Sequence, residues 1–290
     1  MCDEQTERDN ERWRLAKGLT RREFNTAAGG VALASLLPRT ASALAVEESE
    51  VEVPTADGKA DGYFVRPAAG RHAAVIGWPD VMGIRPAFRM MGKRLAESGY
   101  AVLVVNPYYR TARGEVIGEG ESFADPAVRE RLGPHRNSLS PATCVSDGKA
   151  LVAWLDARDS VDSSRKMGTA GYCMTGSYVM RLAAAIPERI GAGASFHGGG
   201  LATDAPDSPH RLAPQIRAGL LIAIAENDDE HDPQARVLLR EAFDAAGVKA
   251  EMEVYAGTLH GWCPLDSRVY NELQAEKAWV RMLALFAREL

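Results

Sequence analysis

Cys173 lies where a strand-like run, a tight glycine turn and a helical run follow one another. The apolar run 166–170 leads into Gly171, and a helical pattern begins at Met174. Such a turn projects its central side chain above a sheet, and the helix N-terminus that follows favours negative charge there. A thiolate is the reactive form of cysteine, and a helix N-terminus lowers the pKa of a thiol. The stretch predicts a nucleophile at Cys173; a small, buried structural cysteine is the alternative.

A nucleophile on such a turn needs an acid and then a histidine, in that chain order and each just beyond a strand. Asp228 and its neighbour Asp229 follow one apolar strand-like run, and His260 follows the next. The histidine would take the thiol proton or pair with the thiolate, while the carboxylate would fix its tautomer and orientation. The order predicts a triad of Cys173, Asp228 and His260, with Asp229 as a rival acid.

These residues require strands that end side by side. From Val46 the chain alternates strand-like runs at 49–54, 61–67, 73–78, 101–105, 166–170, 190–196, 219–225 and 250–255 with helical patterns at 86–98, 141–157, 174–186, 233–246 and 269–289. Several strands are apolar throughout, as strands buried on both faces are. We therefore expect an α/β fold with a mostly parallel central sheet, helices on both faces and an antiparallel N-terminal hairpin. The stretches 110–140 and 198–214 are expected to lie above the sheet, where they could shape specificity.

The motifs resemble those of the dienelactone hydrolase family, which has the α/β-hydrolase fold. The Gly-Tyr-Cys ending at Cys173 matches the family's elbow, the Gly-Thr-Leu-His ending at His260 occupies its histidine loop, and Asp228 holds its acid position. The resemblance covers nearly all of 46–290. It implies a carboxylic ester or lactone hydrolase that forms a cysteine acyl intermediate on a small-molecule substrate, without a cofactor or metal.

The loop after the first parallel strand carries further expectations. Asp80 stands where the family has a glutamate that contacts the resting cysteine, which implies that Asp80 modulates the nucleophile. Backbone N–H groups of Val81 in this loop and of Met174 after the nucleophile are expected to form the oxyanion hole.

Substrate contacts are implied for Tyr108 and Arg110, which look like the family's Tyr-x-Arg stretch. A surface arginine that caps a strand is an equal alternative for Arg110. Two positions depart from the family: Thr175 replaces a glycine of the elbow, and Pro264 replaces a second substrate-binding arginine. Recognition of a dienelactone carboxylate by two arginines is therefore not expected.

Residues 1–45 differ from the rest of the chain. Thr-Arg-Arg-Glu-Phe at 20–24 precedes the small and apolar run 26–37, and small-x-small cleavage patterns follow. The segment resembles a twin-arginine export signal, although Asn and Thr replace the Leu and Lys usual after the Phe. An amphipathic N-terminal helix is the alternative. We expect a signal peptide and cleavage region at 1–45, a hydrolase domain at 46–290, and a periplasmic or secreted monomer exported by the twin-arginine machinery.

Composition limits the other function classes. The 290 residues carry 34 Lys and Arg against 39 Asp and Glu, so the net charge of -5 gives no footprint for nucleic acid or an anionic membrane. The run 26–37 is too short to be a transmembrane anchor. Four cysteines without a CxxC pair argue against a zinc ribbon or a disulfide scaffold.

Three alternatives to the hydrolase were considered. The acidic run 228–232 could be imagined as a metal site, but no HxH or HExxH accompanies it. The GxGxxG of dinucleotide-binding enzymes is missing from the first strand-helix turn. An exported binding protein or thiol-redox sensor stays open as an alternative, with Cys173 reactive or disulfide-bonded to Cys144 or Cys263.

His197, which directly follows the strand-like run 190–196, could face the crevice that holds the predicted triad. We expect it instead to be a structural histidine with hydrogen-bond partners.

Overall fold

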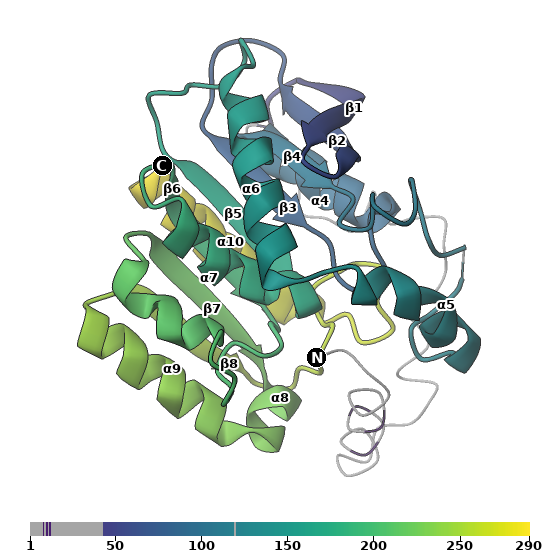
Figure 1. Cartoon of the computed structure of the whole chain (residues 1–290), viewed down its shortest axis with the longest axis vertical. Helices are drawn as coiled ribbons and strands as arrows, with labels where there is room; N and C mark the ends of the chain where they lie inside the picture. The colour runs from purple at the N-terminus through teal and green to yellow at the C-terminus, as the bar shows by residue number, and fades with distance from the viewer. Residues whose placement is uncertain (1–7, 9, 11, 13–42, 119) are drawn as a thin grey trace.

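The computed structural model describes residues 8, 10, 12, 43–118 and 120–290. Most of the export signal predicted at 1–45 therefore lies outside the described residues. The described chain forms one eight-stranded sheet with helices on both faces (Figure 1). This confirms the α/β fold predicted from the sequence.

The sheet has the order β1-β2-β4-β3-β5-β6-β7-β8. The strands are β1 (Val46–Thr55), β2 (Gly58–Pro67), β3 (Ala74–Trp78), β4 (Ala101–Val105), β5 (Met167–Tyr172), β6 (Ile190–Phe196), β7 (Gly219–Ala225) and β8 (Ala250–Tyr255). The first two form the predicted antiparallel hairpin, β2 also pairs antiparallel with β4, and the remaining pairs are parallel. The carboxyl ends of β3 and β5 to β8 consequently lie together at one end of the sheet, its carboxyl end.

The helices are α4 (Pro86–Glu97), α5 (Pro126–Asn137), α6 (Pro141–Asp156), α7 (Gly176–Ala185), α8 (Glu226–His231), α9 (Pro233–Ala246) and α10 (Glu272–Glu289), with 3-10 turns at Cys173–Thr175 and Pro209–Gln215. Asp232 caps α9 by accepting a hydrogen bond from Ala235 N, and Gly247 ends that helix in the left-handed conformation. The helices α5 and α8 were not predicted. The first contains Gly133 and Pro134 and is mostly polar, so it lacks the apolar periodicity that reveals a helix.

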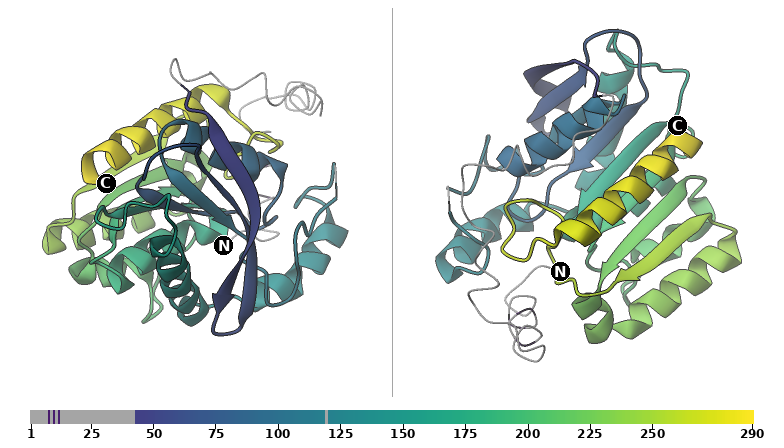
Figure 2. Two further views of the ribbon diagram at one scale, coloured as in Figure 1. Left: turned by 90° about the horizontal axis from the view of Figure 1, so that it is seen from above. Right: turned by 180° about the vertical axis from the view of Figure 1, so that it is seen from behind.

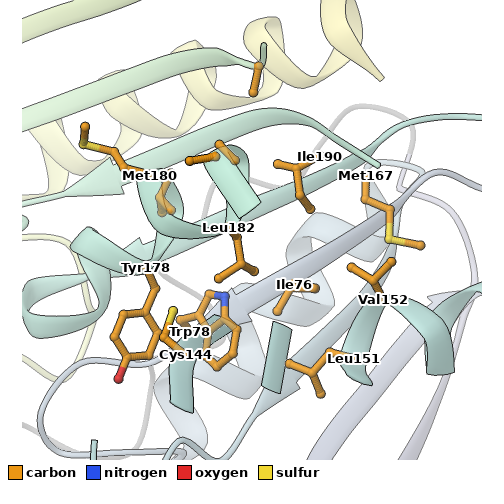
Figure 3. Packing of buried hydrophobic residues seen from close by; sticks show 14 of the residues in the cluster. Ile76, Trp78, Cys144, Leu151, Val152, Met167, Tyr178, Met180, Leu182 and Ile190 are labelled. Carbon is orange, nitrogen blue, oxygen red and sulfur yellow. The ribbon is translucent and has the colours of Figure 1, made fainter. Parts of the chain in front are cut away.

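Two apolar layers hold the sheet between the helices. Helices α6, α7 and α9 cover one face (Figure 1), and α4 with α10 covers the other (Figure 2). In the first layer Trp78 packs edge-on against Tyr178 with ring centroids 5.3 Å apart, beside Cys144 and Leu182 (Figure 3). These layers fix the positions at which the loops leave the carboxyl end of the sheet.

The outermost strand β1 is exposed and acidic. Four glutamates along it form ion pairs with basic residues of neighbouring elements: Glu47 with Arg66, Glu48 with Lys93, Glu50 with Arg89 and Glu52 with Lys59. At the opposite edge of the sheet, Glu251 and Glu253 of β8 pair with Arg281 of α10. Both edges of the sheet thus carry carboxylates.

Candidate active site

Cys173 occupies a strained elbow directly after β5. Its φ of 57° lies in the left-handed region that non-glycine residues rarely adopt. The 3-10 turn Cys173–Thr175 and α7 follow at once, so the N-terminal end of a helix lies beneath the side chain. A Cβ on Gly171 would lie 2.3 Å from the Thr175 carbonyl oxygen, which explains why only glycine fits before the elbow. Strain of this kind is typical of functional sites.

The histidine and one acid of the predicted triad are brought together. His260, which follows β8, has its Nδ1 at 2.8 Å from Oδ2 and 3.0 Å from Oδ1 of Asp228. The side chain of His260 is 7% exposed and that of Asp228 is 29% exposed. The rival Asp229 turns elsewhere, since its Oδ1 accepts a 2.7 Å hydrogen bond from Arg236. The geometry therefore favours Asp228 as the partner of the histidine.

Short α8 and the histidine loop are joined by three hydrogen bonds. Asn227 Oδ1 accepts a 2.8 Å bond from the backbone N–H of His260, and Glu226 Oε2 accepts one from Gly257 N at 3.1 Å. The hydroxyl of Thr258 accepts from Glu226 N at 3.2 Å. Asn227 and Glu226 were not singled out from the sequence, because acidic and amide residues after a strand read equally well as a solvated loop. They fix the loop that carries His260.

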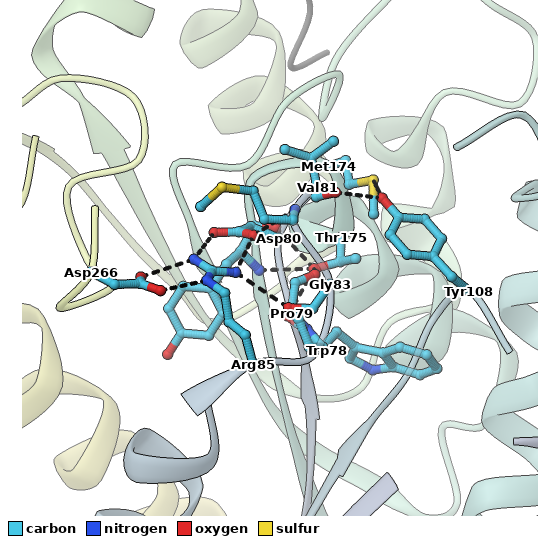
Figure 4. A network of polar contacts seen from close by, with 12 residues as sticks. Trp78, Pro79, Asp80, Val81, Gly83, Arg85, Tyr108, Met174, Thr175 and Asp266 are labelled. Carbon is cyan, nitrogen blue, oxygen red and sulfur yellow. Dashed lines mark hydrogen bonds and ion pairs between the residues drawn. The ribbon is translucent and has the colours of Figure 1, made fainter. Parts of the chain in front are cut away.

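The loop between β3 and α4 is held by a buried ion network (Figure 4). Arg85 donates two hydrogen bonds to the Asp80 carboxylate, at 2.6 and 2.9 Å, and two to that of Asp266, at 2.6 and 3.1 Å. The Arg85 side chain is 2% exposed and that of Asp80 is 8% exposed. Burial alone would lower the pKa of Arg85, but the charges of Asp80 and Asp266 raise it above its ordinary value. The guanidinium stays charged.

Tyr108 is fully buried and contacts the same loop. Its hydroxyl donates a 2.8 Å hydrogen bond to the carbonyl oxygen of Val81 and lies 3.6 Å from the sulfur of Met174. Burial raises the pKa of Tyr108, so the phenol stays protonated and remains a donor. Tyr108 thus lies between the two residues whose N–H groups were predicted to form the oxyanion hole, and it supports one of them.

Residues 60–290 match the Dienelactone hydrolase family. The chain belongs to this family. Among its relatives, a candidate carboxymethylenebutenolidase of Synechocystis sp. is 27% identical over 250 residues, which cover 84% of this chain and 98% of that protein. The carboxymethylenebutenolidase of Rhodococcus opacus is 23% identical, covering 73% of this chain and 79% of that protein. This membership makes the chain a hydrolase.

Solved structures support the fold. The crystal structure of a candidate dienelactone hydrolase from Klebsiella pneumoniae aligns with a TM-score of 0.72 at 24% identity, covering 84% of this chain and 99% of that one. A dienelactone hydrolase-like promiscuous phosphotriesterase from metagenomic libraries aligns with a TM-score of 0.70 at 19% identity, covering 84% and 99% respectively. At these identities the likeness concerns the α/β-hydrolase fold alone.

Arg110, assigned to the substrate by its resemblance to the dienelactone hydrolase family, is occupied by structural partners. Its Nη1 and Nη2 donate to the Asp147 carboxylate at 2.8 and 2.6 Å, and its Nε donates to Asp57 at 2.8 Å. Asp147 lies on α6 and Asp57 in the turn between β1 and β2. The structure therefore places Arg110, whose side chain is 12% exposed, in a clamp between the hairpin and a helix and not at the surface as the cap of a strand.

Thr175, at the position where the dienelactone hydrolase family has a glycine, gives the elbow an extra support. Its hydroxyl accepts a 3.0 Å bond from Tyr172 N and lies within 3.0 Å of the carbonyl oxygens of Trp78 and Pro79 (Figure 4). With one hydrogen, the hydroxyl can donate to one carbonyl at a time. The side chain joins the nucleophile turn to the loop that carries Val81.

The remaining described cysteines are buried and free. Burial raises the pKa of Cys144 and of Cys263 well above the ordinary value for a thiol, so both are poor nucleophiles. Neither of them is bonded to Cys173. The predicted alternative in which Cys173 pairs with Cys144 or Cys263 is therefore wrong.

His197 follows β6 and lies between the nucleophile turn and the catalytic-histidine candidate. Its ring packs edge-on against His260 at 5.0 Å and lies 6.1 Å from the Tyr172 ring. Burial lowers the pKa of His197 well below its ordinary value, and the neighbouring His260 lowers this pKa further, so the His197 ring is neutral. Within the described chain neither ring nitrogen has a hydrogen-bond partner, which differs from the expected hydrogen-bonded side chain.

One described residue of the N-terminal segment reaches this site. Asn10 is buried, its Nδ2 lies 3.4 Å from the carbonyl oxygen of His260, and its Oδ1 accepts a 2.5 Å bond from Asn227. In the unprocessed chain the segment predicted as an export signal therefore contacts the histidine loop.

The described residues bear on metal binding and on membrane insertion. Across residues 43–118 and 120–290 and the three described N-terminal residues, no group of three or more His, Cys, Asp or Glu side chains is placed to hold a metal ion. None of the helices in those same residues is long and apolar enough to cross a membrane. In the acidic run 228–232, Asp228 faces His260, Asp229 pairs with Arg236 and Asp232 caps α9.

Proposed function

We propose that the protein hydrolyses carboxylic esters or lactones through a cysteine acyl intermediate, with Cys173 as nucleophile, His260 as base and Asp228 as the acid that orients it. The main support for this proposal is the contact between Asp228 and His260 at the carboxyl end of the sheet, where Cys173 occupies an elbow with left-handed backbone conformation. Relatives named carboxymethylenebutenolidase support a lactone as substrate.

The proposed reaction has two halves. His260 takes the proton of the Cys173 thiol, the thiolate attacks the carbonyl carbon, and the N–H groups of Val81 and Met174 stabilise the oxyanion. The alkoxide leaves with a proton from His260, which gives an alcohol, or the free hydroxyl end of an opened lactone. His260 then takes a proton from water, the hydroxide attacks the thioester, and the carboxylic acid departs as Cys173 is released. Asp228 holds His260 in the tautomer with hydrogen on Nδ1.

Loss of the thiol is expected to stop hydrolysis. Cys173→Ala, assayed with a small ester after reduction of disulfides, should lower kcat/KM by at least about a thousandfold, since the acyl intermediate cannot form. Cys173→Ser tests the thiolate: a loss of similar size would show that His260 is not an efficient base for a hydroxyl. The buried Cys263→Ala is the matched control and should keep its activity. Full activity of Cys173→Ala, or of wild type completely alkylated at Cys173, would refute the proposal.

We propose further that residues 1–45 form a twin-arginine signal and that the enzyme at 46–290 works in the periplasm or outside the cell. Replacing Arg21 and Arg22 by Lys is expected to leave the precursor in the cytoplasm, because the twin-arginine pair is read by the export machinery. Cell fractionation with N-terminal sequencing of the exported form measures this. Unchanged export of the double variant would contradict the proposal.

A further inference from the structure

Arg85 uses its whole hydrogen-bonding capacity inside the protein. Its five N–H donors go to the two carboxylate oxygens of Asp80, the two of Asp266 and, at 3.2 Å, the carbonyl oxygen of Gly83. Its ring neighbour is Phe88, whose centroid lies 4.8 Å from the guanidinium carbon. No donor is left over for an anionic substrate, so Arg85 does not take the role of the arginine that Pro264 replaces.

The network fixes the backbone beside the predicted oxyanion hole. Asp80 Oδ1, while bound to Arg85, also accepts a 2.9 Å hydrogen bond from Met82 N. On the other side of the same peptide, the Val81 carbonyl oxygen accepts from Tyr108. The peptide between Val81 and Met82 is thus held at both its N–H and its C=O, and the Val81 N–H emerges directly before it.

The same arginine ties two loops that are far apart in the sequence. Asp266 lies six residues after His260, on the segment that leads from the histidine loop towards α10, whereas Asp80 lies between β3 and α4. Figure 4 shows Arg85 between the two carboxylates, and the Tyr108 hydroxyl beside Val81 and Met174. Because the guanidinium group of Arg85 is planar and rigid and binds a carboxylate on each side, it fixes the distance and the angle between the two carboxylates.

We infer that Arg85 and Asp266 are positioning residues. They hold Asp80, and Asp80 holds the loop that presents the Val81 N–H to the oxyanion. They also fix the position of this loop relative to the histidine loop. In this arrangement Asp80 holds the backbone of its own loop directly, at Met82 N, and Arg85 acts through Asp80. This inference rests on the proposed function, because it assigns a task within the same reaction.

The test compares Arg85→Lys and Asp266→Asn with wild type. Lysine keeps the charge but cannot fork towards both carboxylates, and asparagine keeps the shape but not the charge. Removal of one oxyanion donor costs about 100- to 1,000-fold in kcat, so its misplacement in Arg85→Lys should lower kcat about 10- to 100-fold, and Asp266→Asn about 3- to 10-fold. KM should stay within about twofold.

Two further readouts separate positioning from general damage. Affinity for a trifluoromethyl ketone, which forms a tetrahedral oxyanion with the thiol, should fall by the same factor as kcat, because both depend on the Val81 N–H. The rate at which iodoacetamide alkylates Cys173 should not change. The matched control is Asp156→Asn, which alters another forked pair, with Arg189 at 2.6 and 3.1 Å, and should leave kcat unchanged.

The inference would be overturned if kcat were unchanged in Asp266→Asn and Arg85→Lys, or if these variants raised KM alone. It would also be overturned if Asp156→Asn lowered kcat by the same factor. Asp266 is 29% exposed, so Asp266→Asn should fold even if Arg85→Lys does not. Failure of the proposed function is recognised separately, since Cys173→Ala would then remain active. If Cys173→Ala is inactive and the positioning variants behave as wild type, only the inference fails.

Discussion

Asp228→Asn is expected to lower kcat/KM for ester hydrolysis about a thousandfold, whereas Asp229→Asn should leave it within about twofold. The asparagine can still occupy the space beside His260, but an amide can hydrogen-bond the histidine in the wrong tautomer and cannot stabilise its protonated form. The 2.8 Å contact with Nδ1 belongs to Asp228, and Asp229 is occupied by Arg236 on α9. Steady-state kinetics with one small ester and one lactone measure the difference.

The two variants are matched because both acids lie on α8 and each loses one charge. Equal and small effects would show that neither carboxylate serves the histidine. A large loss in Asp229→Asn alone would assign the acid to the neighbour, against the geometry. Thermal unfolding of both variants checks that any loss of activity is not a loss of folded protein.

Gly171→Ala is expected to damage both stability and activity. The added Cβ would lie 2.3 Å from the carbonyl oxygen of Thr175 and 3.2 Å from Val179 Cγ2, so the elbow must move away from β5. Overpacking of this kind costs about 1–3 kcal/mol, which corresponds to a Tm lower by about 2–12 °C in a domain of this size. Because the displaced turn carries Cys173, kcat should fall about a hundredfold in the protein that remains folded.

Gly133→Ala is the control for this variant. Gly133 lies within α5, and a Cβ there would meet nothing within 4 Å. Alanine there gains helix propensity but, as the residue before Pro134, is disfavoured in the helical conformation, so the free energy of unfolding should change by less than about 1 kcal/mol and kcat should stay unchanged. Calorimetry of the two variants gives the comparison. A Gly171→Ala protein as stable and as active as wild type would mean that the elbow adapts more easily than its close contacts indicate.

Local patterns predicted the elements that carry the site and its main residues. The observed bounds of β5, β7 and β8 lie within two residues of the predicted ones. The buried strand β7 is a nearly continuous apolar run, whereas β8 at the sheet edge alternates glutamates with apolar residues. The proposed order of Cys173, Asp228 and His260 was also read from the sequence, since each residue lies within five residues of the end of its strand. The pairing of Asp228 rather than Asp229 with His260 could not be read from it, because neighbouring positions differ only in which way their side chains point.

Contacts between distant segments were beyond prediction from the sequence. Arg85 and Asp266 are 181 residues apart, and nothing in the spacing of either one indicates the other. Arg110 shows the same limit, because its partners come from a hairpin turn and from α6, and only the fold reveals that its donors are occupied. Helix α5 was missed for a different reason, since its stability in the fold depends on packing of Val128 and Leu132 under an otherwise polar surface.

The carboxylates on the two outer strands also bear on how the protein behaves at high concentration. An exposed sheet edge is a template on which a strand of another molecule could assemble. A second copy that approached β1 edge to edge would have to remove water from the ion-paired side chains of Glu48 and Glu50, and the cost of that desolvation would oppose addition of a ninth strand. The charged edges therefore work against fibre-like association.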